Sequence, residues 1–106
     1  MKNLSKKYGK LKAVDQLNLT MDEGEVIALL GHNGAGKTTA IHMMTGMIAP
    51  TSGDVLVDGY SLKTNVNNLR RSLGLCQQFD VLFDDLTVLE HLKLVCDLKC
   101  ADVSKI

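Results

Sequence analysis

The chain of 106 residues (11.6 kDa) has the size of one ordinary domain, which excludes two independent hydrophobic cores. Twelve Lys and Arg residues balance twelve Asp and Glu residues, which excludes a dominant attraction to nucleic acid or an anionic membrane, so no nucleic-acid partner is expected. An apolar fraction of 45% and a single proline are typical of a chain that folds.

We expect neither a membrane-spanning segment nor a secretory signal in this sequence. Its longest purely apolar run is Val26–Leu30, far short of the roughly 20 residues that a spanning helix needs. The N-terminal lysines are not followed by an apolar stretch of signal-peptide length. Without such a signal we expect a cytosolic setting, and because the three cysteines are an odd number with no CxxC pair, we expect reduced thiols.

The first 50 residues show a strand, loop and helix pattern. Residues 12–21 alternate imperfectly between apolar and polar, which predicts a half-buried strand. The unbroken apolar run Val26–Leu30 predicts a strand covered on both faces, as in a parallel sheet. Apolar residues three and four apart predict a helix over Lys37–Met47, which Ala49-Pro50 ends.

Two short elements are expected in the middle of the chain. Asp54–Asp58 alternates before the turn pair Asp58-Gly59, which predicts a short strand that enters a tight turn. Residues 60–68 have the composition of a loop, and Val66–Leu73 predicts a short basic helix at its end.

The last third of the chain begins with a predicted strand over Leu73–Gln77. Thr87 and Glu90 then form the S/T-x-x-E pattern of a capping box. Apolar residues at helical spacing follow, which predicts a helix that runs through about Cys100.

The segment Gly31–Thr38 fits the phosphate-loop pattern G-x-x-x-x-G-K-[ST] at every fixed position. It follows a predicted strand and opens a predicted helix, as phosphate binding requires. Glycines clear the approach for backbone amides from Gly34 to Thr39, Lys37 adds a full positive charge, and Thr38 offers a hydroxyl to Mg²⁺. The predicted nucleotide-binding residues of this segment are Gly31, His32, Asn33, Gly34, Ala35, Gly36, Lys37, Thr38 and Thr39. The alternative, a glycine-rich turn with a solvated lysine, is disfavoured by the complete match.

Short sequence blocks that are typical of one protein family occur along nearly the whole chain. They are Tyr8-Gly9, Ala13-Val14-Asp15, Leu30–Thr39, Thr45-Gly46, Pro50–Gly53, Leu73–Gln78, Val81–Asp84, Leu86–Val88 and Glu90–Leu92. With these blocks the chain resembles the nucleotide-binding domain of ATP-binding cassette (ABC) transporters. His32-Asn33 and the stretch from Phe83-Asp84 to His91 are most similar to subfamily A, which is associated with lipid movement. The resemblance implies an α/β P-loop NTPase, as one partial domain over residues 1–106 with a mixed β-sheet and flanking helices.

The same resemblance implies roles for residues outside the phosphate loop. Tyr8 is similar to the aromatic residue that stacks on adenine, and Val14 to a residue lining the same pocket. Gln78 is similar to the glutamine that contacts Mg²⁺ or the attacking water, so the implied catalytic pair is Lys37 with Gln78, and the implied metal contacts are Thr38 and Gln78. Gln77 stands where many relatives carry proline, which leaves the choice between the two glutamines open.

Three family motifs have no counterpart in this sequence. No two glycines are adjacent, so the LSGGQ-type signature is missing. The apolar runs before Asp58 and Asp97 are not followed by the glutamate of a Walker B motif, and His91 lies upstream of the place of the switch histidine. The resemblance implies that the intact protein hydrolyses ATP to drive transmembrane, lipid-type transport. Its ATP-binding domain would work at the cytosolic face with transmembrane domains and a second nucleotide-binding domain, and these 106 residues alone are expected to show negligible hydrolysis.

Three other functions stay open at the level of sequence. A soluble ABC-type ATPase that acts on nucleic acid or translation would share the phosphate loop and the glutamine. A small P-loop kinase or GTPase is less favoured, because 30 residues precede Gly31 whereas those proteins place the loop close to their first strand. A non-catalytic truncated product is the third.

Overall fold

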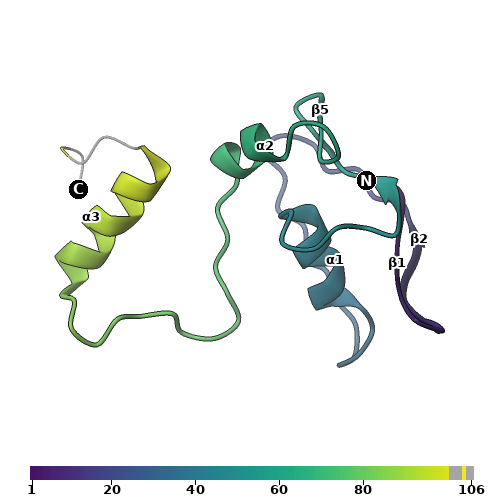
Figure 1. Ribbon diagram of the computed structural model, residues 1–106, viewed down its shortest axis with the longest axis horizontal. Helices are drawn as coiled ribbons and strands as arrows, with labels where there is room; N and C mark the ends of the chain where they lie inside the picture. The colour runs from purple at the N-terminus through teal and green to yellow at the C-terminus, as the bar shows by residue number, and fades with distance from the viewer. Residues whose placement is uncertain (101–103, 105–106) are drawn as a thin grey trace. The chain divides into compact units, whose positions relative to one another are not determined.

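The computed structural model describes residues 1–100 and 104. The chain forms two compact units, Met1–Gly74 and Leu75–Ile106. The strands and the helices α1 (Lys37–Met44) and α2 (Val66–Ser72) belong to the first unit, and α3 (Val88–Lys99) belongs to the second. Figure 1 labels the three helices along the chain. No helix of the described residues has the length and apolar character needed to cross a bilayer.

An antiparallel hairpin begins the first unit. Strand β1 (Lys2–Tyr8) pairs with β2 (Leu11–Leu17), and Tyr8 lies opposite Leu11 across a two-residue turn. Strand β3 (Ser52–Asp54) pairs antiparallel with the other edge of β1, so the strand order is β2-β1-β3. The strand predicted over residues 12–21 is thus confirmed, although it begins one residue earlier and ends at Leu17.

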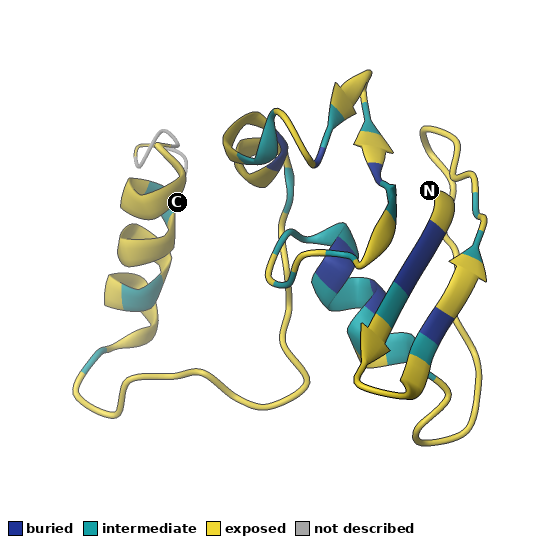
Figure 2. Cartoon of the chain, turned by 45° about the vertical axis from the view of Figure 1, so that its right-hand side comes forward, coloured by how far each residue is buried: buried dark blue, intermediate teal, exposed yellow. Residues whose placement is uncertain are grey.

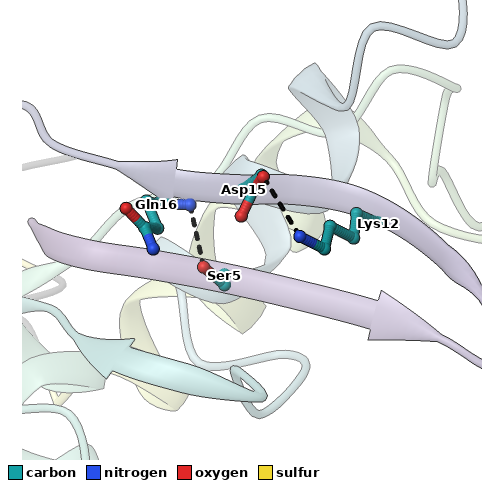
Figure 3. A network of polar contacts seen from close by, with 4 residues as sticks. All are labelled: Ser5, Lys12, Asp15 and Gln16. Carbon is teal, nitrogen blue, oxygen red and sulfur yellow. Dashed lines mark hydrogen bonds and ion pairs between the residues drawn. The ribbon is translucent and has the colours of Figure 1, made fainter.

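The hairpin is irregular, and one polar contact stabilises the irregularity. The register shifts between the pairs Leu4–Leu17 and Lys6–Val14, and Gln16 adopts a left-handed backbone with φ of 49°. Figure 3 shows the hydrogen bond that the backbone amide of Gln16 donates to the hydroxyl of Ser5, at 2.8 Å. Ser5 is a buried polar residue, so this bond also keeps its hydroxyl from being unsatisfied.

Helix α1 (Lys37–Met44) follows the phosphate loop as predicted but ends earlier than expected. Gly46 adopts φ of 73°, the left-handed conformation in which helices commonly stop. The hydroxyl of Thr45 donates to the Ile41 carbonyl, and Arg70 donates to the Gly46 carbonyl at 2.9 Å. Helix α1 therefore ends because of the left-handed backbone at Gly46, before the chain reaches Pro50.

A second hairpin and a short helix complete the first unit. Strands β4 (Leu56–Val57) and β5 (Tyr60–Ser61) pair antiparallel around Asp58-Gly59, which confirms the tight turn. The return strand β5 lies in a segment that was predicted as loop. Helix α2 (Val66–Ser72) confirms the short basic helix.

The hydrophobic core of the first unit is small and includes residues from the strands and from both helices. Figure 2 shows buried segments on the strands and on α1 and α2. The buried apolar residues are Leu4, Val14, Ala40, Met43, Val55, Leu62 and Leu69. This core holds the β1–β2 hairpin against α1, and so it sets the distance between the hairpin and the phosphate loop.

The prediction of a doubly covered strand at Val26–Leu30 is wrong, because these residues form no ladder. Ile27 and Leu29 line an apolar cavity with α1, whereas Val26 is fully exposed and Leu30 is 88% exposed. The segment keeps a two-residue alternation but finds no partner among the described strands, and a strand requires hydrogen bonds to a neighbour. The strand predicted over Leu73–Gln77 is absent for the same reason.

The second unit contains α3 (Val88–Lys99), and the predicted capping box is confirmed. The Glu90 amide donates to the Thr87 hydroxyl, and the Glu90 carboxylate accepts from the Thr87 amide at 2.8 Å. The residues before the helix are fixed by His91, whose Nε2 accepts from the Phe83 amide at 2.9 Å while the two rings stack. The stretch from Phe83 to His91, which resembles subfamily A in sequence, therefore forms the start of α3 and is held by hydrogen bonds among its own residues.

The capping box predicts a pH dependence for the start of α3. Hydrogen bonds from the Thr87 hydroxyl and amide lower the pKa of the Glu90 carboxyl below its ordinary value of about 4.5. A group with a lowered folded-state pKa stabilises the fold above its unfolded pKa and loses that effect as pH falls through the folded value. We therefore expect the Thr87 amide proton shift, followed by NMR, to titrate below pH 4.5 and to stop titrating in Glu90→Gln. A midpoint at or above 4.5 would contradict the capping box.

Candidate nucleotide-binding site

A cavity of about 480 Å³ lies between the turn of the first hairpin and the phosphate loop. Tyr8 and three consecutive residues of β2 line one side, and the loop with the start of α1 lines the other. The lining residues are Tyr8, Leu11, Lys12, Ala13, His32, Asn33, Gly34, Ala35, Gly36, Lys37, Thr38 and Thr39. An aromatic side chain, two lysines and a helix start therefore surround one space, which has the size of a small-ligand pocket.

Gly36 joins the phosphate loop to the hairpin. It adopts φ of 92°, and a Cβ at this position would collide with the Ala13 carbonyl oxygen and lie 3.3 Å from Cγ2 of Val14. Gly34 is also left-handed, with φ of 85°, but a Cβ there would meet open space. Glycine at position 36 is thus required twice, by conformation and by the close approach of two backbones.

The N-terminus of α1 presents unshielded backbone amides to the cavity. Gly36 caps the helix without a side-chain hydrogen bond, and no acidic residue lies in the first turn. The Gly36 carbonyl accepts the first helical bond, from the Ala40 amide at 2.9 Å, so the amides before Ala40 have no partner within the helix. With the helix dipole, these amides favour an anion at this end.

The ammonium of Lys37 is hydrogen-bonded to backbone carbonyls of the phosphate loop. It donates to the carbonyl of Gly31 and to the carbonyl of His32, the latter at 2.9 Å. These two bonds fold the side chain back over the turn that precedes its own helix. A positive charge is thereby held beside the glycines and the amides at the start of α1.

The structure brings the hairpin aromatic to the same cavity as the loop. Tyr8 is half exposed, and it is one of the residues that line the cavity. Its neighbours Leu11, Lys12 and Ala13 line the cavity too, although sequence reasoning did not single them out as contacts. The signal that could have found them is the Gly9-Lys10 pair, because a two-residue turn places Leu11 opposite Tyr8.

Two residues expected at the site are not among the described residues that line this cavity. Val14 is not among the residues that line this cavity; it belongs to the core with Leu4 and Ala40, and its Cγ2 would lie 3.3 Å from a Cβ on Gly36. Gln78 lies in the second unit, outside the unit that holds the cavity.

The donor set fits Mg²⁺ as a partner of phosphate rather than as an ion in a cage of protein ligands. Thr38 is one of the residues that line the cavity. The described residues contain no group of three His, Cys, Asp or Glu side chains that could hold a metal ion. Mg²⁺ commonly keeps several waters and takes most of its other ligands from the phosphates of a bound nucleotide, which this arrangement allows.

Comparison with known proteins places these observations in a family. Residues 14–105 match the ABC transporter family model. The chain is 51% identical over 102 residues to the retinal-specific phospholipid-transporting ATPase ABCA4 of Bos taurus, covering 93% of this chain and 4% of that protein. It is 53% identical over 87 residues to the human phospholipid-transporting ATPase ABCA3, covering 82% of this chain and 5% of that protein. The chain thus spans about one twentieth of the length of these curated relatives.

Solved structures agree with the sequence matches. The chain superposes on the ATP-binding subunit of an ABC transporter with a TM-score of 0.83 and 34% identity, over 92% of this chain and 41% of that chain. It also superposes on a dimeric ATP-binding cassette in a post-hydrolysis state with ADP and Pi, with a TM-score of 0.79 and 30% identity over 92% and 46%. The α/β P-loop fold expected from the sequence is thereby shown, and the chain belongs to the ABC transporter family as part of a nucleotide-binding domain.

Proposed function

We propose that residues 1–106 bind Mg-ATP as the phosphate-loop part of an ABC transporter nucleotide-binding domain. The observation that carries this proposal is the single cavity that Tyr8 shares with Lys37 and the amides at the start of α1. Its two sides suit the two ends of the nucleotide. An aromatic ring offers a stacking surface to adenine, while the glycine-opened loop and the lysine attract phosphate.

The proposed transport substrate is a lipid. The relatives that match include two phospholipid-transporting ATPases, and a glucosylceramide transporter, ABCA12 of Mus musculus, is 48% identical over 96 residues, covering 91% of this chain and 4% of that protein. All three names describe lipids with polar head groups. In this proposal, ATP binding and hydrolysis drive such a lipid across a membrane, and the domain lies on the cytosolic side.

The proposed partners are transmembrane domains and a second nucleotide-binding domain. Solved cassettes of this fold include dimers, one of them with ADP and Pi bound. The catalytic carboxylate that activates water would come from outside these 106 residues, because no apolar run here is followed by the Asp-Glu pair. Within the chain, Lys37 and the loop amides would bind phosphate, Thr38 would offer its hydroxyl to Mg²⁺, and Gln78 would act near the metal or the water.

Calorimetric titration of the full chain tests the proposal with MgATP, MgGTP and magnesium tripolyphosphate. We expect MgATP to bind more tightly than tripolyphosphate, because the base adds stacking on Tyr8. Tyr8→Ala should weaken MgATP by about 5- to 150-fold, the range for base stacking on an aromatic side chain, and should leave tripolyphosphate unchanged.

Tyr8→Phe is the matched control, because it keeps the ring and removes only the hydroxyl; it should bind MgATP like the unaltered chain. Tight binding that prefers guanine would instead favour a GTPase. If Tyr8→Ala changes the affinity for neither MgATP nor tripolyphosphate, the hairpin is not part of the binding site.

A further inference from the structure

We propose that Lys6 is the positioning residue for Tyr8: it holds the aromatic ring at the cavity and so raises the affinity for the base of the nucleotide. This inference rests on the proposed function, and it concerns a residue that does not itself line the cavity. It assigns to a strand lysine an effect on adenine binding that acts through the tyrosine ring.

Two contacts of the Lys6 ammonium carry the inference. The Nζ atom donates to the Ala49 carbonyl at 2.7 Å and lies 5.3 Å from the centroid of the Tyr8 ring. The second distance is within the range at which a cation is attracted to an aromatic face. One ammonium therefore connects the ring to the turn that follows α1.

The same turn is fastened to β1 by its backbone. The Thr51 amide donates to the Ser5 carbonyl at 2.8 Å, and the Lys7 amide donates to the Thr51 hydroxyl at 3.0 Å. The Ala49 carbonyl is thus a fixed acceptor beside the end of β1. A lysine held on a fixed acceptor restricts the ring above it, whereas a lysine in solvent would not.

Lys6 contacts the Tyr8 ring but takes no part in the cavity wall. Among the described residues that line the cavity, Tyr8 is included and Lys6 is not. Lys6 is half-buried, whereas its neighbour Lys7 is exposed, as expected for successive residues on opposite faces of a strand. Lys6 thus contacts the ring without lining the cavity, and a base that enters the cavity meets a ring whose position is already restricted.

The test compares MgATP with magnesium tripolyphosphate, which has no base, on the full chain by calorimetry. Lys6→Met keeps an unbranched side chain but removes the cation, and should weaken MgATP by about two- to fivefold with tripolyphosphate unchanged. Lys6→Arg should restore MgATP affinity. Lys7→Met is the matched control for the loss of one positive charge and should change neither ligand.

A second readout does not depend on nucleotide. The chain has two tyrosines and no tryptophan, so in a Tyr60→Phe background all aromatic emission above the phenylalanine range comes from Tyr8. Lys6→Met should increase the quenching of this emission by acrylamide, and Lys7→Met should not.

The outcomes separate this inference from the proposed function. Equal loss of MgATP and tripolyphosphate in Lys6→Met, or no loss of either, would overturn the role of Lys6 while ATP binding stands. If the unaltered chain binds neither ligand, the proposed function fails, and unchanged quenching in Lys6→Met would then overturn the contact as well.

Discussion

Replacing Lys37 by alanine is expected to lower the affinity for MgATP at least about a hundredfold, which corresponds to roughly 2.7 kcal/mol. A cation about 4 Å from a phosphate oxygen gains on the order of 4 kcal/mol at an effective dielectric constant near 20, and part of this is offset because the ammonium leaves the Gly31 and His32 carbonyls. Calorimetry with MgATP and with tripolyphosphate measures the loss. Both ligands should weaken together, since this lysine binds phosphate and not the base.

Lys63→Ala is the matched control for this experiment. It removes the same charge from an exposed position after the β4–β5 hairpin, away from the cavity residues. We expect its MgATP affinity to stay within about twofold, the size of a screened surface interaction. Equal binding by Lys37→Ala and the unaltered chain would show that ATP is not held by this loop.

Gly36→Ala is expected to lower the free energy of unfolding of the first unit by about 2–5 kcal/mol and to weaken the binding of MgATP as well. A left-handed backbone costs an alanine about 1–2 kcal/mol, and overpacking typically costs about 1–3 kcal/mol more. Here the methyl group would press on the Ala13 carbonyl, which is backbone and cannot rotate away. Urea unfolding followed by tyrosine emission reports on this unit, because Tyr8 and Tyr60 both lie within Met1–Gly74.

Gly34→Ala separates conformation from collision. Its φ of 85° is close to the 92° of Gly36, but a Cβ at Gly34 meets nothing within 4 Å. It should therefore cost only the conformational part, about 1–2 kcal/mol. Equal destabilisation by the two substitutions would mean that the contact between the loop and β2 contributes nothing.

Local patterns predicted the elements whose hydrogen bonds lie within a few residues. The capping box of Thr87 and Glu90 is closed by residues three apart, and α1 begins at Lys37 as the loop pattern requires. The tight turn at Asp58-Gly59 was likewise foreseeable, because its geometry depends on those two residues. Its return strand β5 was missed, since two residues carry too little periodicity to reveal a strand.

The segment Val26–Leu30 shows where such reasoning fails. Its apolar run predicted a buried strand, but a strand is defined by a neighbour that accepts and donates hydrogen bonds, and composition cannot supply one. Ile27 and Leu29 still line the cavity beside α1, whereas Val26 and Leu30 are exposed, so both the predicted pairing and the predicted cover on two faces are wrong.

By itself, the sequence determined the phosphate-loop pattern and the family resemblance, because glycine, lysine and threonine at fixed spacing form a local motif that can be read without the fold. Only the tertiary structure decided that Tyr8 and Lys37 line one cavity, and that Lys6 lies beside the aromatic ring. These relations join residues far apart in the chain through the register of β1 with β2 and the approach of Gly36 to Ala13. The distances between these residues follow from the packing of the whole first unit, and no local sequence pattern determines that packing.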